Sequence, residues 1–217
     1  MAMDDEIDLP QFIEMVNQIA QTLRAHEQEL DALDNFVGDG DHGRTLGKGM
    51  RAVEEELAQA DANAIDEVLE LVGRTLLRNM GGAMGPLLAT FFKGMAIPAR
   101  GKTTIDLEVW SDMVAGGAMG VRALGKASPG DKTMLDAIVP AESAILGAVE
   151  ARVRLRDAAR SSAEAAIEGA NRTCDMVARA GRARNLGERS RGYKDAGAQT
   201  MALIFSAIHE YLDSRDS

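Results

Sequence analysis

The strongest chemical signal in the sequence is a glycine-rich run that carries carboxylates. Asp39 and Asp41 alternate with glycine in Gly38-Asp39-Gly40-Asp41-His42-Gly43, and Asp34 lies shortly before them. Three carboxylates so close together repel one another unless a positive group lies between them. Mg²⁺ takes oxygen ligands in octahedral geometry and commonly binds through a few carboxylates together with phosphate oxygens. The run therefore predicts a Mg²⁺–phosphate site formed by Asp34, Asp39 and Asp41.

Other interpretations of this run have to be weighed beside the metal site. An ordinary acidic loop whose aspartates cap helices has the same spacing. An EF-hand that began at Asp39 would have Gly43, Arg44 and Met50 where Asp or Asn, Gly and Glu are required, so the run is not an EF-hand. A nucleophile of the haloacid-dehalogenase type would need a preceding strand. His42 either donates to a phosphate, orients a carboxylate, or is a surface histidine of the loop.

Two further segments offer groups that bind anions. Gly81-Gly82-Ala83-Met84-Gly85-Pro86 precedes an apolar stretch and could present backbone N–H groups to phosphate, although a plain helix–helix turn has a similar composition. Arg182 and Arg184 add positive charge. The sequence has no Gly-x4-Gly-Lys-Ser/Thr loop and no set of protein-kinase motifs. A nucleotide would therefore be bound by another route.

The composition limits the fold, the partners and the compartment. Hydrophobic residues make up 46% and aromatic residues 4% of the 217 residues, which favours close-packed helices over β-sandwiches. The net charge of −10 disfavours nucleic acid and anionic membranes as partners. Cys174 is the single cysteine, so an intrachain disulfide is excluded. Residues 1–8 are acidic and lack an apolar run, which argues against a signal peptide, and the sequence has no apolar run of about 18 residues. We therefore expect a cytoplasmic protein.

Apolar residues recur at helical spacing along most of the chain. They predict an all-α fold of eight antiparallel amphipathic helices without strands, in a single domain over residues 1–217 that starts with a flexible acidic N-terminus at 1–8. Asp106 and Asp131 are expected to be N-caps, and Pro140 is expected to kink its helix. The apolar stripes span residues 12–23, 46–57, 65–77, 87–97, 109–121, 134–149, 156–180 and 201–212.

Glycines gather in four of the segments between these helices, at 38–49, 81–85, 125–130 and 181–197. In an up-and-down bundle, alternate connections lie at the same end. These four follow the first, third, fifth and seventh predicted helices. We therefore expect all four to meet at one end of the bundle and to form the site there.

Taken together, these motifs resemble the L subunits of bacterial dihydroxyacetone kinases. The similarity rests on the segments 38–43, 81–86, 125–134, 181–190 and 195–198, in order and at compatible spacing over nearly the whole chain. The resemblance implies a barrel of eight antiparallel helices with the nucleotide at one end. It also implies that Asp34, Asp39 and Asp41 hold two Mg²⁺ ions that bridge the phosphates of ADP or ATP. The implied nucleotide contacts are His42, Gly43, Arg44, Thr45, Ala83 and Met84 on the phosphate side, and Gly125, Met134, Arg182, Asp195, Ala196 and Gly197 toward the rest of the nucleotide.

The resemblance further implies partner proteins. In that family, a K subunit holds dihydroxyacetone covalently on a histidine, and an M subunit carries the phosphohistidine that recharges the bound ADP. In the ATP-dependent branch an equivalent domain is fused to the K domain, for which this chain is too short. Phosphoryl transfer depends mainly on positioning and charge neutralisation. The lack of a Ser-His or Cys-His constellation in the sequence agrees with such a phosphotransferase.

Several features keep alternatives open. Met84 stands where the family typically has Ser, and Ala196 replaces a frequent Pro. Arg44-Thr45 differs from the commoner Leu-Asn. A Thr at the position of Thr45 is similar to the sequences of the ATP-dependent branch. The donor is either the M subunit or ATP, and the acceptor is dihydroxyacetone or another short ketose. Fatty-acid kinases, which have Asp-Thr-Gly in place of Asp41-His42-Gly43, fit less well. The other alternative is a regulatory module that binds nucleotide without catalysing a reaction. The sequence leaves the oligomeric state open, and a homodimer is one of the possibilities.

Overall fold

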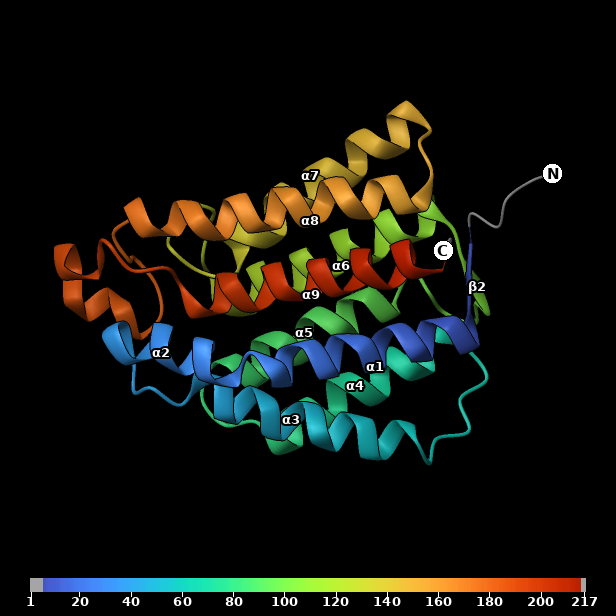
Figure 1. Cartoon of the computed structure of the whole chain (residues 1–217), viewed down its shortest axis with the longest axis horizontal. Coiled ribbons are helices and arrows are strands. Elements are labelled where there is room, and N and C mark those ends of the chain that lie inside the picture. The colour runs from blue at the N-terminus through green and yellow to red at the C-terminus, as the bar shows by residue number, and fades with distance from the viewer. Residues whose placement is uncertain (1–5, 216–217) are drawn as a thin grey trace.

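The computed structural model describes residues 6–215 of the chain and is all-α apart from one short strand pair (Figure 1). The fold class expected from the sequence is thereby confirmed. The α-helices are α1 Leu9–Ala25, α2 Glu27–Val37, α3 His42–Leu57, α4 Ile65–Asn79, α5 Met84–Ala96, α6 Leu107–Gly125, α7 Leu135–Ala151, α8 Leu155–Arg172 and α9 Ala196–Ser214. The 3-10 helices are η1 Thr173–Asp175 and η2 Arg182–Ser190, and the strands are β1 Ile7–Asp8 and β2 Thr104–Ile105.

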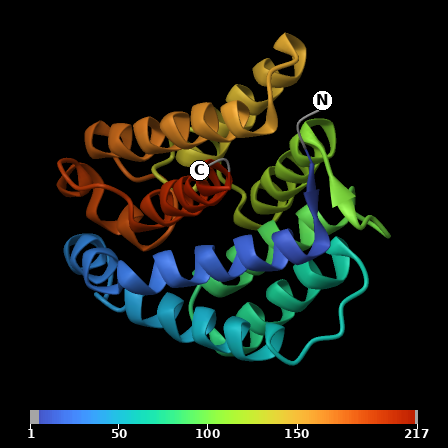
Figure 2. The same ribbon diagram turned by 45° about the vertical axis from the view of Figure 1, so that its right-hand side comes forward.

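Eight of the helices form a closed ring around one apolar core. Going round the ring, α1 packs on α3, each helix from α3 to α8 packs on the next, and α9 returns to α1. Figure 2 shows α9 (red) between α8 (orange) and α1 (blue). Large side chains such as Phe12, Phe91, Trp110 and Phe205 fill the interior. None of the helices in residues 6–215 is both long and apolar enough to cross a membrane.

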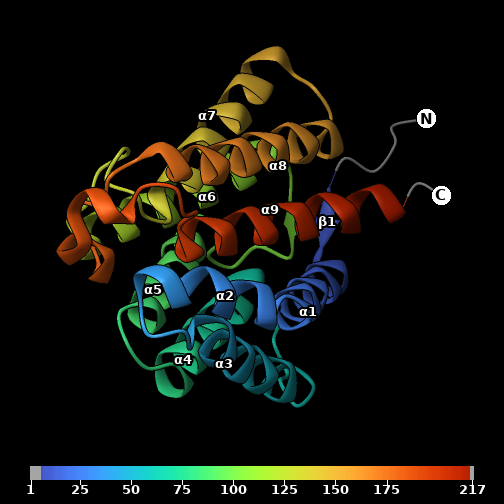
Figure 3. The same cartoon turned by 60° about the vertical axis from the view of Figure 1, so that its left-hand side comes forward.

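Two elements differ from the sequence prediction. The short helix α2 was not expected, because its apolar pattern is weak: within residues 27–36 Leu30 is the one buried hydrophobic residue. It packs on η2, and both lie at the same end of the ring (Figure 3). The expectation of no strand was also wrong. β1 and β2 pair antiparallel with Ile7 opposite Ile105, and strands this short are set by tertiary pairing rather than by local pattern.

The N-terminal expectation is tested only in part. Residues 1–5 of the segment predicted to be flexible lie outside the described residues. Ile7 and Asp8, in contrast, belong to β1, and Ile7 is buried. The Asp8 carboxylate also caps α1 by accepting the N–H of Gln11 at 2.9 Å. The last residues of that segment therefore have a defined structure.

One of the two predicted N-caps is correct. Asp106 caps α6 by accepting the N–H of Val109 at 2.9 Å. The prediction for Asp131 was wrong, because its carboxylate accepts the N–H of Ser128 and α7 begins only at Leu135. The intervening Lys132 has φ +62°, in the left-handed region, so no right-handed helix can run through it.

Two further predictions concern α7 and α8. Pro140 lies inside α7, and its kink stays a prediction. The stripe predicted to run to residue 180 was too long, because α8 ends at Arg172. There the carbonyl of Thr173 accepts from the ammonium of Lys132, so the chain leaves the helical path.

Candidate functional site

The four glycine-bearing connections meet at one end of the ring and enclose a cavity of about 280 Å³. Of the metal ligands and nucleotide contacts that the resemblance implies, all but Gly43 and Arg44 line it, and Arg184 does not line it either. Those that do are Asp34, Asp39, Asp41, His42, Thr45, Ala83, Met84, Gly125, Met134, Arg182, Asp195, Ala196 and Gly197. Residues far apart in the sequence thus form one cavity with contributions from α2, α3, α5, α6 and α9.

Asp34, Asp39 and Asp41 converge at the polar end of the cavity. Each offers one carboxylate oxygen, and these oxygens all lie within 4.8 Å of one another. Asp34 is oriented by its own loop, because its Oδ2 accepts the N–H of Gly40 at 2.8 Å and that of Asp41 at 3.3 Å. Gly40 has φ +71°, which the tight loop requires and glycine tolerates. A set of three hard oxygen donors at this spacing fits Mg²⁺.

Arg182 is the positive group beside these carboxylates, and its guanidinium forms an ion pair with Asp39. This hydrogen bond holds the pKa of Asp39 below its usual range. Partial burial and the negative charge of Asp39 raise the pKa of Asp41. The two neighbouring carboxyls thus shift in opposite directions. Such a cluster gains from a cation between the oxygens.

His42 is fixed by a residue that the sequence analysis missed. Its Nε2 lies 2.8 Å from Oγ1 of Thr200, and the Thr200 hydroxyl donates to the carbonyl of Ala196 at 3.0 Å. The hydroxyl oxygen therefore accepts from Nε2–H, which leaves Nδ1 as the unprotonated nitrogen of a neutral ring. Burial lowers the pKa of His42 and favours this neutral form. No sequence signal could have found Thr200, since it follows His42 by 158 residues.

The start of α3 does not present its amides to the cavity, contrary to expectation. The N–H groups of Gly43 and Arg44 donate to Oδ1 of Asp31, at 2.8 and 3.1 Å. The side chain of Arg44 turns back to the carbonyl of Gly40 and is 68% exposed. Gly43 instead permits close helix packing, because a Cβ there would lie 1.9 Å from the carbonyl oxygen of Glu27. The predicted glycine loop 38–49 is also shorter than expected, because α3 begins at His42.

The start of α5 is the better anion-binding helix terminus. No side chain caps it, and Gly81, Gly82, Ala83 and Met84 all line the cavity. The first N–H groups of a helix lack intrahelical partners and attract anions. The segment 81–84 therefore brings backbone donors to the cavity. Gly82 lies close to Arg182, since a Cβ there would lie 3.5 Å from Nη2 of Arg182.

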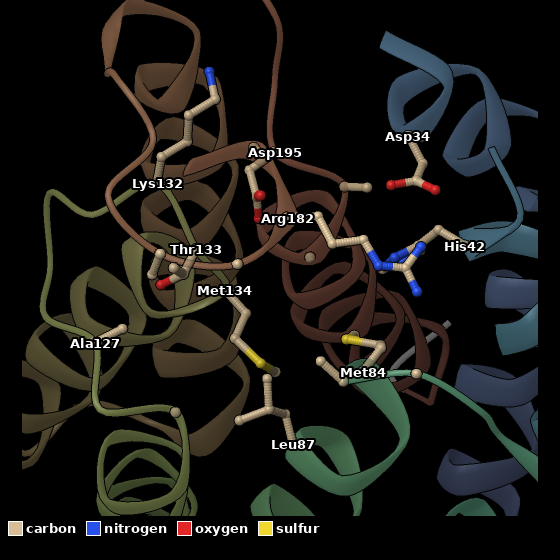
Figure 4. Close-up of a pocket in the computed structure, with 18 of the residues that line it drawn as sticks. Asp34, His42, Met84, Leu87, Ala127, Lys132, Thr133, Met134, Arg182 and Asp195 are labelled. Atoms are coloured by element: carbon tan, nitrogen blue, oxygen red, sulfur yellow. The ribbon is translucent and has the colours of Figure 1, made fainter. Parts of the chain in front are cut away.

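The opposite end of the cavity is apolar. Figure 4 shows Leu87 and Met134 together on the side away from Asp34 and His42, with Met84 between them and Arg182. Val121, Ala127 and Leu135 are further apolar residues of the cavity lining. Leu87, Val121 and Leu135 were not expected at the site, because a side chain that faces a cavity has the same helical spacing as one that faces the core.

Lys132 is a further missed residue. It is 2% exposed, and its side chain points away from the cavity toward the segment between α8 and α9 (Figure 4). Its ammonium donates to the backbone carbonyls of Thr173, Ser190 and Tyr193. Burial lowers the pKa of Lys132, and the nearby carboxylate of Asp195 opposes that shift.

Asp195 caps α9 in the wall of the cavity, where its Oδ2 accepts the N–H of Ala198 at 2.8 Å. Burial raises the pKa of Asp195 from 3.8 to about 6. A carboxyl whose pKa is raised by folding stabilises the fold in its protonated form. Its contribution is therefore present below pH 4 and is lost as the pH rises from about 4 to about 6.

The substitution Asp195→Asn tests this shift, since Asn keeps a capping oxygen but does not titrate. We expect the free energy of unfolding of the wild type, relative to that of the variant, to fall by about 1–2 kcal/mol between pH 4 and pH 7. Urea titrations at unit pH steps measure this difference. A constant difference across that range would contradict the raised pKa.

Comparisons with known proteins agree with this geometry. Residues 36–210 match the model of the DAK2 domain. The ADP-binding subunit of the PEP-dependent dihydroxyacetone kinase of Escherichia coli is 34% identical over 198 residues, which are 91% of this chain and 94% of that subunit. The L-erythrulose 1-kinase of Mycolicibacterium smegmatis is 34% identical over 92% of this chain but only 35% of its own length. The dihydroxyacetone kinase of C. freundii, solved with AMP-PNP and Mg²⁺, superposes with a TM-score of 0.69 at 29% identity over 91% of this chain and 33% of that one.

Proposed function

This chain belongs to the DAK2 domain family, and on that premise we propose that it is the ADP-binding, phosphoryl-transferring subunit of a dihydroxyacetone kinase. One observation carries the proposal. Three carboxylates whose oxygens lie within 4.8 Å form the polar end of a cavity whose other end is apolar. A nucleoside diphosphate is divided in the same way, with anionic phosphates at one end and an uncharged aromatic base at the other.

Each part of the cavity has a role in this proposal. Asp34, Asp39 and Asp41 would hold two Mg²⁺ ions, which when bound neutralise the charge that spreads over the phosphate oxygens during transfer. The backbone N–H groups at the start of α5 donate to the phosphates, and Arg182 adds a guanidinium beside them. The apolar wall around Met134 receives the base and excludes water from it.

The acceptor alcohol would be held by a separate protein. Phosphoryl transfer needs orientation and charge neutralisation rather than a nucleophile on this chain. We therefore infer that a K subunit brings dihydroxyacetone to the exposed carboxylates Asp39 and Asp41. A phosphohistidine-bearing M subunit would recharge ADP in place, in the cytoplasm. The E. coli relative supports the M subunit as the donor, because it belongs to a PEP-dependent kinase. The chain covers 94% of the length of that relative.

A second acceptor has specific support. Two relatives of comparable identity are kinases of L-erythrulose and D-erythrulose, although the chain spans only about a third of each. Both sugars are ketoses one carbon longer than dihydroxyacetone. The acceptor would be chosen by the partner that binds it, so the same nucleotide-binding subunit could serve either reaction.

Reconstitution tests the proposal. Nucleotide released from freshly purified protein is identified by mass spectrometry, and the chain is then mixed with Mg²⁺, ADP, a dihydroxyacetone-loaded K subunit and a phosphohistidine donor. We expect retained ADP, and triose phosphate only when every component is present. Product with ATP but not with the phosphohistidine donor would assign the ATP-dependent branch, and faster turnover with erythrulose would assign a tetrose acceptor. Tight ADP binding without any product would show a regulatory module instead.

A further inference from the structure

The segment between α8 and α9 forms one wall of the cavity. We call residues 173–193 the strap. It contains η1 and η2 and carries Gly181 and Arg182 into the cavity, where Arg182 meets Asp39. Its buried hydrophobic residues, Ala178 and Ala183, form a small cluster separate from the main core. So little apolar burial would not by itself hold a segment of this length in place.

Polar contacts to Lys132 hold the strap at both ends. The Lys132 ammonium lies 2.8 Å from the carbonyl oxygen of Thr173 and 3.3 Å from that of Met176, near the start of the strap. It also lies 2.7 Å from the carbonyl oxygen of Ser190 and 2.5 Å from that of Tyr193, near the end. An ammonium has three N–H donors, so the three short contacts use them all and the long one is shared. Lys132 therefore has no donor left for a ligand in the cavity.

The turn that carries Lys132 is itself fixed. The buried carboxylate of Asp136 accepts the N–H of Gly130 at 2.5 Å and that of Thr133 at 2.7 Å. These bonds hold Lys132 at φ +62°, a conformation that side-chain-bearing residues rarely adopt. As a result, neighbouring residues of one loop face opposite ways. Met134 enters the cavity, whereas the Lys132 side chain reaches into the strap (Figure 4).

We propose that Lys132 is a positioning residue whose ammonium gathers the strap carbonyls, fixes Arg182 beside the carboxylates, and so slows the release of bound nucleotide. The inference rests on the proposed function, since it takes the ligand of the cavity to be a nucleotide. Other contacts also hold the strap. Among them are the Arg182–Asp39 ion pair, the stacking of Tyr193 on Phe36 with ring centroids 4.5 Å apart, and the N–H of Arg179, which donates to the carbonyl of Asp131 at 3.1 Å. Loss of Lys132 is thus expected to loosen the strap rather than to detach it.

The test uses the full chain and the variant Lys132→Met, with Lys126→Met as the matched control. Lys126 lies in the same loop and also has positive φ, at +50°, but its side chain is exposed. Dissociation of a fluorescent ADP analogue in Mg²⁺ is followed after addition of excess ADP, well below the unfolding temperature. If the strap of unliganded Lys132→Met is ordered only a tenth of the time, the nucleotide should bind about tenfold more weakly. With the rate of association unchanged, it should leave about tenfold faster. Lys126→Met should match the wild type.

Amide hydrogen exchange provides a local readout without nucleotide. In Lys132→Met, the amides of Ala178 and Gly192 should exchange faster, because they are hydrogen-bonded within the strap, to Ser190 and Cys174. The exchange rates of the amides in α4 and α5 should not change. Equal acceleration throughout the chain, or unchanged nucleotide dissociation from a folded variant, would overturn the proposal, since either result assigns Lys132 a general structural role or none.

A second variant covers the case in which Lys132→Met does not fold. The Ser190 hydroxyl accepts the N–H of Ala178 and donates to the carbonyl of Gly187, both within the strap and outside the cavity. Ser190→Ala should therefore also speed nucleotide release, by a smaller factor, and unchanged release would overturn the proposal. Should the wild type bind no nucleotide, the proposed function fails. Faster exchange confined to the strap would then still support the positioning role of Lys132.

Discussion

Replacing Asp41 by Asn is expected to weaken Mg²⁺-dependent ADP binding by about 100-fold or more, because the variant loses one of the three charged ligands of the proposed metal site. Asn has nearly the same shape as Asp and retains an oxygen, so the loss arises from charge. The same substitution removes repulsion between Asp41 and Asp39, which raises the pKa of Asp41 in the unliganded protein. The variant should therefore be at least as stable as the wild type without ligand, while binding nucleotide far less tightly.

Calorimetric titration with ADP in the presence and absence of Mg²⁺ measures this effect, and thermal unfolding without ligand checks the fold. Asp61→Asn is the matched control, since Asp61 is exposed in the connection between α3 and α4, at the opposite end of the ring (Figure 1). It should bind as the wild type does. Equal affinity of Asp41→Asn and the wild type would refute the metal site and with it the proposed function.

Replacing Gly94 by Ala should destabilise the fold by about 3 kcal/mol, through a clash between α5 and α6. A Cβ at Gly94 would lie 2.4 Å from the carbonyl oxygen of Gly116 and 2.9 Å from Cα of Gly117. Both are backbone atoms, so the helices would have to separate. Because α5 and α6 also carry Met84 and Gly125 to the cavity, nucleotide affinity should fall together with stability.

Gly147→Ala is the matched comparison for that change. Gly147 is likewise inside a helix, α7, but is exposed, and a Cβ there would meet no atom within 4 Å. Alanine favours the helical conformation over glycine, so this variant should gain about 0.5–1 kcal/mol. Urea unfolding of both variants gives the two free energies. If both substitutions changed stability in the same direction and to the same extent, the close approach of α5 and α6 would be refuted.

Sequence alone could predict the features of this protein that depend on neighbours along the chain. The carboxylates at 34, 39 and 41 are close together in space because they are close in sequence. The common end of the four glycine-bearing connections follows from the alternating direction of successive long helices. Asp106 caps α6 through the N–H only three residues later. In each case the physical cause acts over a few residues or follows from helix direction.

Only the tertiary structure could decide which polar groups are already occupied. Gly43 and Arg44, at the start of α3, were implied as nucleotide contacts on the phosphate side, but their N–H groups donate to Asp31 of the preceding helix. The tautomer of His42 depends on Thr200, 158 residues away, and Lys132 reaches carbonyls 41 to 61 residues ahead of it. A buried polar group must find a partner, and that partner can come from any part of the chain that folding brings near. The sequence thus determined which groups could bind a nucleotide, and the packing of distant segments decided which of them are left to do so.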